Sequence, residues 1–141
     1  MNDRYLCRAK RKSDKKWICG NLIQTDDGVY IIQNYVPQHL IGKYEVDPST
    51  ICQCTGLKDK NGKLIWENDI VKYHFGEEYA PIKYGVYQSC FDLTTTGHCG
   101  FYVDWPENIN MRKDLGYWIN MVDAEIVGNI FDNPELLEVG E

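Results

Sequence analysis

The chain has 141 residues, 43% of them hydrophobic, 13% aromatic and 26% charged, with a formal net charge of −6; this composition can form a core without a metal or disulfide and is unlike that of a disordered chain. No apolar run approaches the roughly 20 residues of a membrane helix, and the N-terminus lacks the apolar segment of a signal peptide. We therefore expect a cytoplasmic protein with no membrane contact, no cofactor and six reduced cysteines.

Short β-like runs separated by turn residues dominate the first 49 residues. Residues 4–9 alternate in polarity, the polar loop KRKSDKK follows, and residues 16–24 resume the pattern, which predicts a first hairpin. The turn TDDG at residues 25–28 is typical of a tight hairpin, because Asp-Gly supplies a positive φ. Residues 29–36 predict a third strand, and residues 37–49 are less regular.

The stretch TGLKDKNGKLIWENDIVKY, residues 55–73, is strongly specified for shape. A predicted strand at residues 50–55 leads into it, and Asn61-Gly62 is a strong hairpin signal. The residues around Asn68 predict a second tight corner, after which residues 70–75 alternate as a strand. The stretch contains no catalytic or cofactor motif.

The remainder of the chain also predicts strands, at residues 83–93, 101–105, 117–121 and 124–131. Aromatic residues at strand spacing indicate a core or a subunit interface: Trp66, Tyr73, Phe75, Tyr84 and Tyr87. Near the end Asn133 can cap a short helix, with Pro134 at its first position and Glu135 in its first turn. We therefore expect a mostly β protein that ends in a single helical turn or a short helix.

The charge is divided unevenly along the chain. Residues 1–20 hold seven Lys/Arg and two Asp, a charge of +5, whereas residues 21–141 carry −11. This division indicates either a binding patch at the basic end or a self-complementary surface that favours oligomers. The candidate contact residues for nucleic acid or a protein partner are Arg8, Lys10, Arg11, Lys12, Lys15, Lys16 and Trp17.

Phosphate contacts by this basic hairpin would be non-specific and sensitive to salt, and Trp17 could stack on a base. The competing interpretation is a solvated loop, because the acidic remainder of the chain repels a polyanion.

Cysteine and histidine residues offer two other kinds of site. Cys52 and Cys54 form a C-x-C pair, but no second pair has the usual zinc-ligand spacing, so structural thiols are favoured. Cys99 adjoins His98, and Asp104 is nearby, which supplies the parts of a thiol nucleophile with its base. Adjacency in sequence does not establish that geometry, so a metal- or thiol-dependent enzyme is an alternative to a protein without enzymatic activity.

Residues 55–73 closely resemble the signature of the YopX family, small proteins of phages and prophages in Gram-positive bacteria. Arg8, Lys16-Trp17 and Gly20 are similar to the family's opening hairpin. VDPSTICQCTG at residues 46–56 is similar to the segment that leads into the signature, and AEIVGNIFDNPELLE at residues 124–138 to the closing strand and short helix. Asn68 stands where the family commonly has Gly, which supports a corner with positive φ.

The resemblance implies a mostly β fold of antiparallel hairpins, with a small SH3-like barrel portion and a short C-terminal helix. It implies one YopX-like unit over residues 1–141, with an N-terminal hairpin region about 1–49 and a barrel-like region about 50–141. No catalytic residue or cofactor follows from it.

We expect a prophage-encoded protein without enzymatic activity that acts through protein contacts, including self-association. Nucleic-acid binding by the basic hairpin is the second hypothesis, and a metal- or thiol-dependent enzyme is the third.

Overall fold

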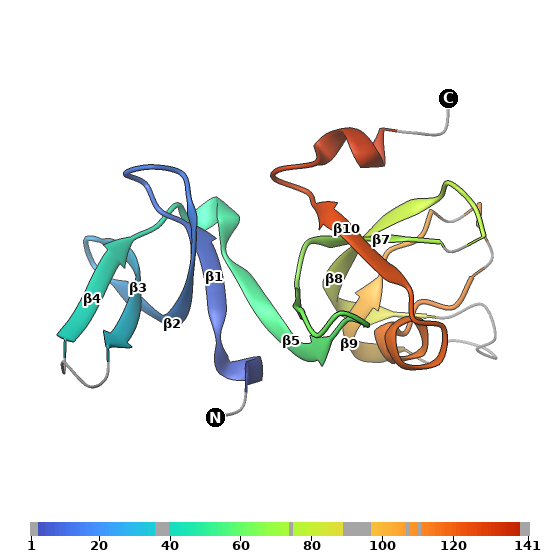
Figure 1. Ribbon diagram of the computed structural model, residues 1–141, viewed down its shortest axis with the longest axis horizontal. Helices are drawn as coiled ribbons and strands as arrows, with labels where there is room; N and C mark the ends of the chain where they lie inside the picture. The colour runs from blue at the N-terminus through green and yellow to red at the C-terminus, as the bar shows by residue number, and fades with distance from the viewer. Residues whose placement is uncertain are drawn as a thin grey trace. The chain divides into compact units, whose positions relative to one another are not determined.

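The computed structural model describes residues 3–35, 40–73, 75–88, 97–106, 108–109 and 111–138. The chain divides into two compact units, residues 1–56 and 57–141. Both units consist mainly of antiparallel β-strands, which confirms the predicted mostly β class (Figure 1). No described helix is long and apolar enough to cross a membrane.

The first unit is built on one antiparallel sheet. Its strands are β1 (Cys7–Lys10), β2 (Trp17–Thr25), β3 (Gly28–Tyr35), β4 (Leu40–Glu45) and β5 (Cys52–Lys58). They lie in the spatial order β4-β3-β2-β1-β5. The strand β5 continues into the second unit, where it pairs with β6 (Leu64–Trp66). Short 3-10 helices, η1 (Asp3–Tyr5) and η2 (Pro48–Thr50), precede β1 and β5. The first hairpin and the turn at residues 25–28 are confirmed.

β4 is a strand that the sequence did not predict. Its residues pair with β3 in continuous register from Tyr30↔Glu45 to Tyr35↔Leu40. The local signal is weak because Gly42 interrupts the segment, and glycine is depleted in strands. Pairing with β3 therefore decides the conformation of this segment.

A small apolar core lies under the first sheet. Its buried members are Ala9, Ile18, Ile31 and Val46. Gly20 is required where β2 passes β3, because a Cβ at that position would lie 2.6 Å from the backbone oxygen of Ile32. The η2 turn is also tied to β1: Thr50 Oγ1 accepts a 2.8 Å hydrogen bond from the Lys10 N–H and donates to the Asp47 carbonyl.

The second unit contains a four-stranded antiparallel sheet in the order β10-β7-β8-β9. The strands are β7 (Asp69–Lys72), β8 (Tyr79–Tyr87), β9 (His98–Val103) and β10 (Glu125–Asn129), and Figure 1 shows β10 running beside β7. β9 and β10 are the two edges, so within the described part of the chain this sheet stays open and does not close into a barrel. The expected SH3-like barrel portion is not confirmed.

The core of the second unit is built around two tryptophans. Trp105 and Trp118 are almost fully buried, with ring centroids 5.2 Å apart, and both pack edge-on against Tyr73. These large side chains cover one face of the sheet, together with Leu115 and Ile119. Ile65 of β6 is fully buried in the same core, so both strand and non-strand segments pack against the sheet.

The predicted strand at residues 117–121 is wrong. Tyr117–Met121 forms a π-helical turn, η3. Trp118 and Ile119 are both buried, which neighbouring residues of a strand with one covered face cannot be. The Trp118 indole N–H donates to the carbonyl of Arg112 at 2.7 Å, so core packing overrides the β propensity of this aromatic run.

Two corners of the central stretch follow the prediction. In the β5–β6 loop Gly62 has φ +82°, and the Asp59 carboxylate accepts hydrogen bonds from the backbone N–H groups of Asn61 and Lys63. At the second corner Asn68 has φ +73°, and Asp69 Oδ2 accepts a 2.9 Å hydrogen bond from the Trp66 N–H.

The C-terminal segment forms a four-residue 3-10 helix, η4 (Pro134–Leu137), in place of the short helix that we expected. Asn133 precedes it, but its side chain does not cap the helix. The Asn133 side-chain oxygen instead accepts a 3.2 Å hydrogen bond from the Asn129 N–H. The side chain turns back toward the end of β10 and closes the loop between the two elements.

We predict that Asn68→Val lowers the free energy of unfolding by about 1–2 kcal/mol relative to Asn68→Gly, because a β-branched residue is strained at φ +73°. Urea unfolding followed by tryptophan fluorescence measures the difference. Both variants lose the hydrogen bond from Lys83 Nζ to Asn68 Oδ1, so their comparison isolates the backbone effect. Equal stability of the two variants would contradict the strained corner.

Candidate functional site

The basic hairpin is a regular β1–β2 hairpin closed by residues 11–16. Arg8 lies opposite Cys19, and Lys10 lies opposite Trp17. The loop is held by two backbone hydrogen bonds, from the Arg11 N–H to the Lys16 carbonyl and from the Lys15 N–H to the Arg11 carbonyl, both 2.9 Å long. Lys15 takes a positive φ of 63° at the corner of this loop.

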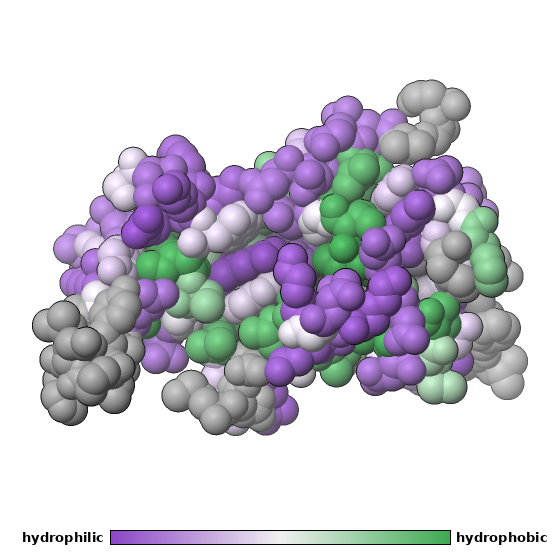
Figure 2. Space-filling model, viewed as in Figure 1, coloured by the Kyte–Doolittle hydropathy of each residue, from purple (hydrophilic) through white to green (hydrophobic). Residues whose placement is uncertain are grey.

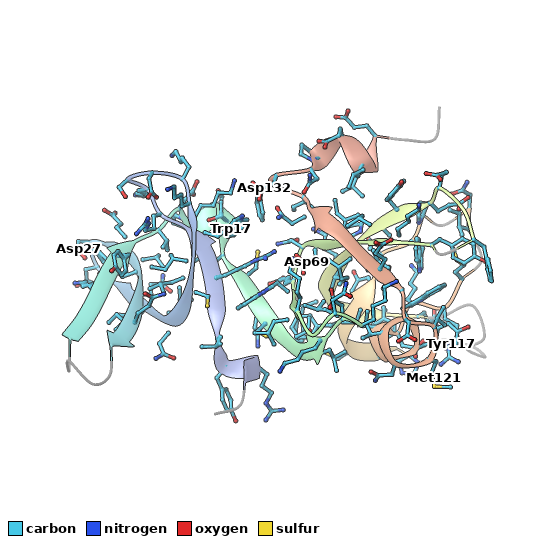
Figure 3. All side chains as sticks on the ribbon, viewed as in Figure 1. Trp17, Asp27, Asp69, Tyr117, Met121 and Asp132 are labelled. Atoms are coloured by element: carbon cyan, nitrogen blue, oxygen red, sulfur yellow. The ribbon has the colours of Figure 1, made fainter. Side chains whose placement is uncertain are left out.

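Trp17 is covered by two cations from the neighbouring strand. The Arg8 guanidinium carbon lies 4.5 Å from the centroid of the Trp17 ring, and Lys10 Nζ lies 5.3 Å from it. Figure 3 labels Trp17 at the start of β2. Because cation–π contacts of this kind use the face of the indole, part of the surface on which a base would stack is already occupied.

Arg11 and Lys12 are paired within the first unit. The Arg11 guanidinium forms an ion pair with Asp14 and lies 5.4 Å from the Tyr44 ring centroid. Lys12 Nζ lies 3.1 Å from Glu45 Oε2. The hydrogen bond with Arg11, and then that from the Lys16 N–H, hold the pKa of Asp14 below its ordinary value.

Lys15 and Lys16 are exposed, and their side chains make no hydrogen bond or ion pair to any residue that the structure describes. The whole first unit carries eight Lys/Arg and six Asp/Glu, a formal charge of only +2. The structure therefore brings the seven predicted contact residues into one hairpin, but four of its six cations already have partners, two at Trp17 and two at carboxylates.

The thiols do not gather into a metal site among the described residues. Cys52 and Cys54 are fully buried on the same side of β5, with the exposed Gln53 between them. Cys7, Cys19 and Cys99 form no disulfide. Cys90 lies outside the described residues.

His98 and Cys99 point to opposite faces of β9, because successive side chains alternate along a strand. Cys99 pairs across the sheet with Val86, and its Sγ lies 4.0 Å from Tyr84 Oη, which raises the pKa of Tyr84. The His98 ring lies 5.3 Å from the Tyr87 ring on the other face. The hydrogen-bonded pair of thiol and imidazole that nucleophilic catalysis requires is not formed by these neighbours.

An exposed apolar sheet face lies at the outer end of the β8–β9 hairpin. It consists of two cross-strand pairs, Tyr84↔Phe101 and Val86↔Cys99, with the Tyr84 and Phe101 rings 5.0 Å apart. Val86 is 74% exposed and Tyr84 is 55% exposed. The next cross-strand pair on the same face, Ile82↔Val103, is fully buried in the core.

We call these four residues the β8–β9 face. Sequence reasoning identified Tyr84 as a core or interface residue but not the face as a whole. The sequence does place Tyr84 and Val86, and likewise Cys99 and Phe101, two residues apart, which puts each pair on one face of its strand. It does not give the register that sets the two strands side by side.

Figure 2 shows that hydrophilic residues cover much of the visible surface, with hydrophobic residues in small groups between them.

The comparisons with known proteins decide the family. The YopX protein family matches residues 4–138, nearly the whole chain. The chain belongs to the YopX family. The resemblance inferred from residues 55–73 is thereby confirmed. Among solved structures, protein EF1440 from Enterococcus faecalis is similar: the two chains are 22% identical, 93% of this chain and 96% of that chain are covered, and the TM-score is 0.50.

At that identity the likeness to protein EF1440 concerns the fold alone. A comparison with curated proteins gives no match. The comparisons thus establish the family and the fold, and the function has to be inferred from the arrangement of the residues described above.

We predict that alkylation of the native protein labels Cys19 and Cys99 first, because both are exposed, and leaves Cys52 and Cys54 unlabelled. Iodoacetamide labelling over time, mapped by peptide mass spectrometry, measures the order. The urea-unfolded protein, in which all cysteines react, is the control. Labelling of Cys52 at the rate of Cys99 would contradict the burial of β5.

Proposed function

We propose that this YopX-family protein is a non-enzymatic protein-interaction module that associates with a second copy of itself through the β8–β9 face. The observation that carries the proposal is the exposure of Val86 and Tyr84 on a sheet face that continues directly from the core. Family membership supports a prophage-encoded protein.

The chemistry of the β8–β9 face favours a second copy as the partner. All of its side chains are uncharged, so it offers no charge pattern that would select a different protein. A neutral patch of this kind can face its own copy across a two-fold axis, as isologous dimers do. Covering the exposed parts of Val86 and Tyr84 would remove apolar surface from water, which favours association.

Catalysis is disfavoured by the separation of the predicted groups. His98 and Cys99 lie on opposite faces of β9, and the buried Cys52 and Cys54 are shielded from solvent. These positions support the expectation of a protein without enzymatic activity.

Nucleic-acid binding remains the second hypothesis, but the geometry gives it less support. Trp17 is covered by Arg8 and Lys10, and Arg11 and Lys12 are paired with carboxylates. The exposed Lys15 and Lys16 are then the residues to change. Binding of DNA that falls steeply with salt and is abolished by Lys15→Glu with Lys16→Glu would favour this hypothesis.

We predict that the protein is a dimer in solution and that Val86→Asp makes it a monomer, because the change places a charge at the centre of the apolar contact. Multi-angle light scattering at about 0.1 M and about 1 M salt measures the mass, and the dimer should persist at high salt because screening weakens only charged contacts.

Phe75→Asp is the matched control. Phe75 is 80% exposed but lies in the β7–β8 turn, at the opposite end of β8 from Val86, so this variant should remain a dimer. Circular dichroism checks that both variants stay folded. A monomeric wild-type protein, or a Val86→Asp dimer, would rule out the proposed interface.

A further inference from the structure

The second unit also contains a groove that belongs to neither the basic hairpin nor the β8–β9 face. It lies between the β7–β8 turn, the segment that follows Trp105, and η4, and its volume is about 540 Å³. We call it the η4 groove. Volumes of about 300–1,000 Å³ are typical of ligand sites, and this one exceeds the space of a single side chain.

One side of the η4 groove is acidic. Glu77 and Glu78 line it from the β7–β8 turn, and both are exposed. The Tyr79 hydroxyl donates a 2.9 Å hydrogen bond to Glu77 Oε2, which orients that carboxylate. This hydrogen bond, together with burial and the charges of Glu77 and Glu125, raises the pKa of Tyr79.

Lys72 pairs with this side of the groove but does not neutralise it. Lys72 Nζ lies 3.8 Å from Glu77 Oε1, and the Glu77 side chain is 76% exposed, so the pair is weak and screened by solvent. Two carboxylates beside one lysine leave a net negative charge at the rim of the groove.

The other side of the groove is apolar and fixed in place. Leu136 and Leu137 line it from η4, and Ile109 lines it from the segment after Trp105. η4 is positioned by Asn129, whose side-chain oxygen accepts 3.0 Å hydrogen bonds from the N–H groups of Phe131 and Asp132.

A close approach at Gly128 holds the same turn. A Cβ at Gly128 would lie 2.3 Å from Asn133 Oδ1 and 2.6 Å from its Cγ, so Asn133 can pack against β10 only because residue 128 is glycine. The leucine wall is therefore preorganised by the closing segment of the chain, which reduces the entropy cost of binding.

We propose that the η4 groove binds the side chain of an arginine or lysine presented by a partner protein. These side chains join an apolar stem to a cationic head, which matches a groove lined by two leucines and two carboxylates. The Asn108 side chain, which also lines the groove, offers an amide oxygen to the same head. The proposal extends the proposed function by naming the chemistry of a partner, and depends on it only in taking the ligand to be a protein.

A protein is favoured over a free amine by the shape of the site. Glu77, Glu78, Pro106 and Asn108 on the rim are all exposed, and the volume leaves space beside the basic side chain for a neighbouring residue. An extended segment crossing the groove can therefore place a basic side chain between the two walls while its backbone stays outside.

The test uses fluorescein-labelled peptides and the full-length protein. The probe is a short peptide with Leu-Arg-Leu at its centre, and its matched control carries citrulline in place of arginine, which keeps the shape and removes the charge. Fluorescence polarisation at about 0.05 M and about 0.5 M salt measures binding. The arginine peptide should bind at low salt, and the citrulline peptide should bind at least about tenfold more weakly.

Two protein variants assign the site. Glu77→Gln with Glu78→Gln should weaken the arginine peptide by about tenfold or more. Asp26→Asn with Asp27→Asn removes the same charge from another hairpin turn and should leave binding unchanged. The Val86→Asp variant should bind the peptide as the wild type does, so failure of the proposed dimer and failure of this site are distinguishable.

Four outcomes overturn the proposal: equal binding of the citrulline peptide, unchanged binding by the Glu77→Gln, Glu78→Gln variant, loss of binding in the Asp26→Asn, Asp27→Asn control, or binding of arginine amide or putrescine as tight as that of the peptide. A salt-sensitive self-association that the Glu77→Gln, Glu78→Gln variant loses would also overturn it, since the occupant would then be a second copy of this chain.

Discussion

The corner between Trp66 and Asp69 fixes the second unit. Asp69 is almost fully buried, and its carboxylate accepts the Trp66 N–H, which closes the turn. Asn68 takes a left-handed conformation at which its N–H donates to Ile82 of β8 and its carbonyl accepts from the N–H of Ile130, just after β10. One residue thus joins the elements on both sides of β7, and the register of the sheet depends on its φ.

From this corner the β8 strand carries both proposed surfaces. Tyr79, at its beginning, lies in the η4 groove, and Tyr84 and Val86, near its end, lie on the β8–β9 face. The buried Ile82 stands between them and anchors the strand to the tryptophan core. A single well-anchored strand can therefore present two surfaces of different chemistry, one acidic with an apolar wall and the other neutral and apolar.

The basic hairpin shows why the charge of a sequence segment does not give the charge of a surface. Its cations contact residues distant in sequence: Lys12 forms an ion pair with Glu45, and Arg11 lies over the Tyr44 ring. Arg11 also forms an ion pair with Asp14 within its own loop. Exposed ion pairs of this kind contribute little stability, but they lower the positive potential available to a polyanion.

The sequence alone determined the β class, the first hairpin, the corners at Gly62 and Asn68, and the family, because turn chemistry and strand alternation are local properties. Tertiary packing decided what local signals could not. The run at Tyr117–Met121 has a β-like sequence but forms a π-helical turn, because both Trp118 and Ile119 are buried. The segment β4 has a weak local signal but forms a strand, because it pairs with β3. The β8–β9 face and the η4 groove join residues from separate segments, so only the folded chain, whose register and turns bring those segments together, could reveal them.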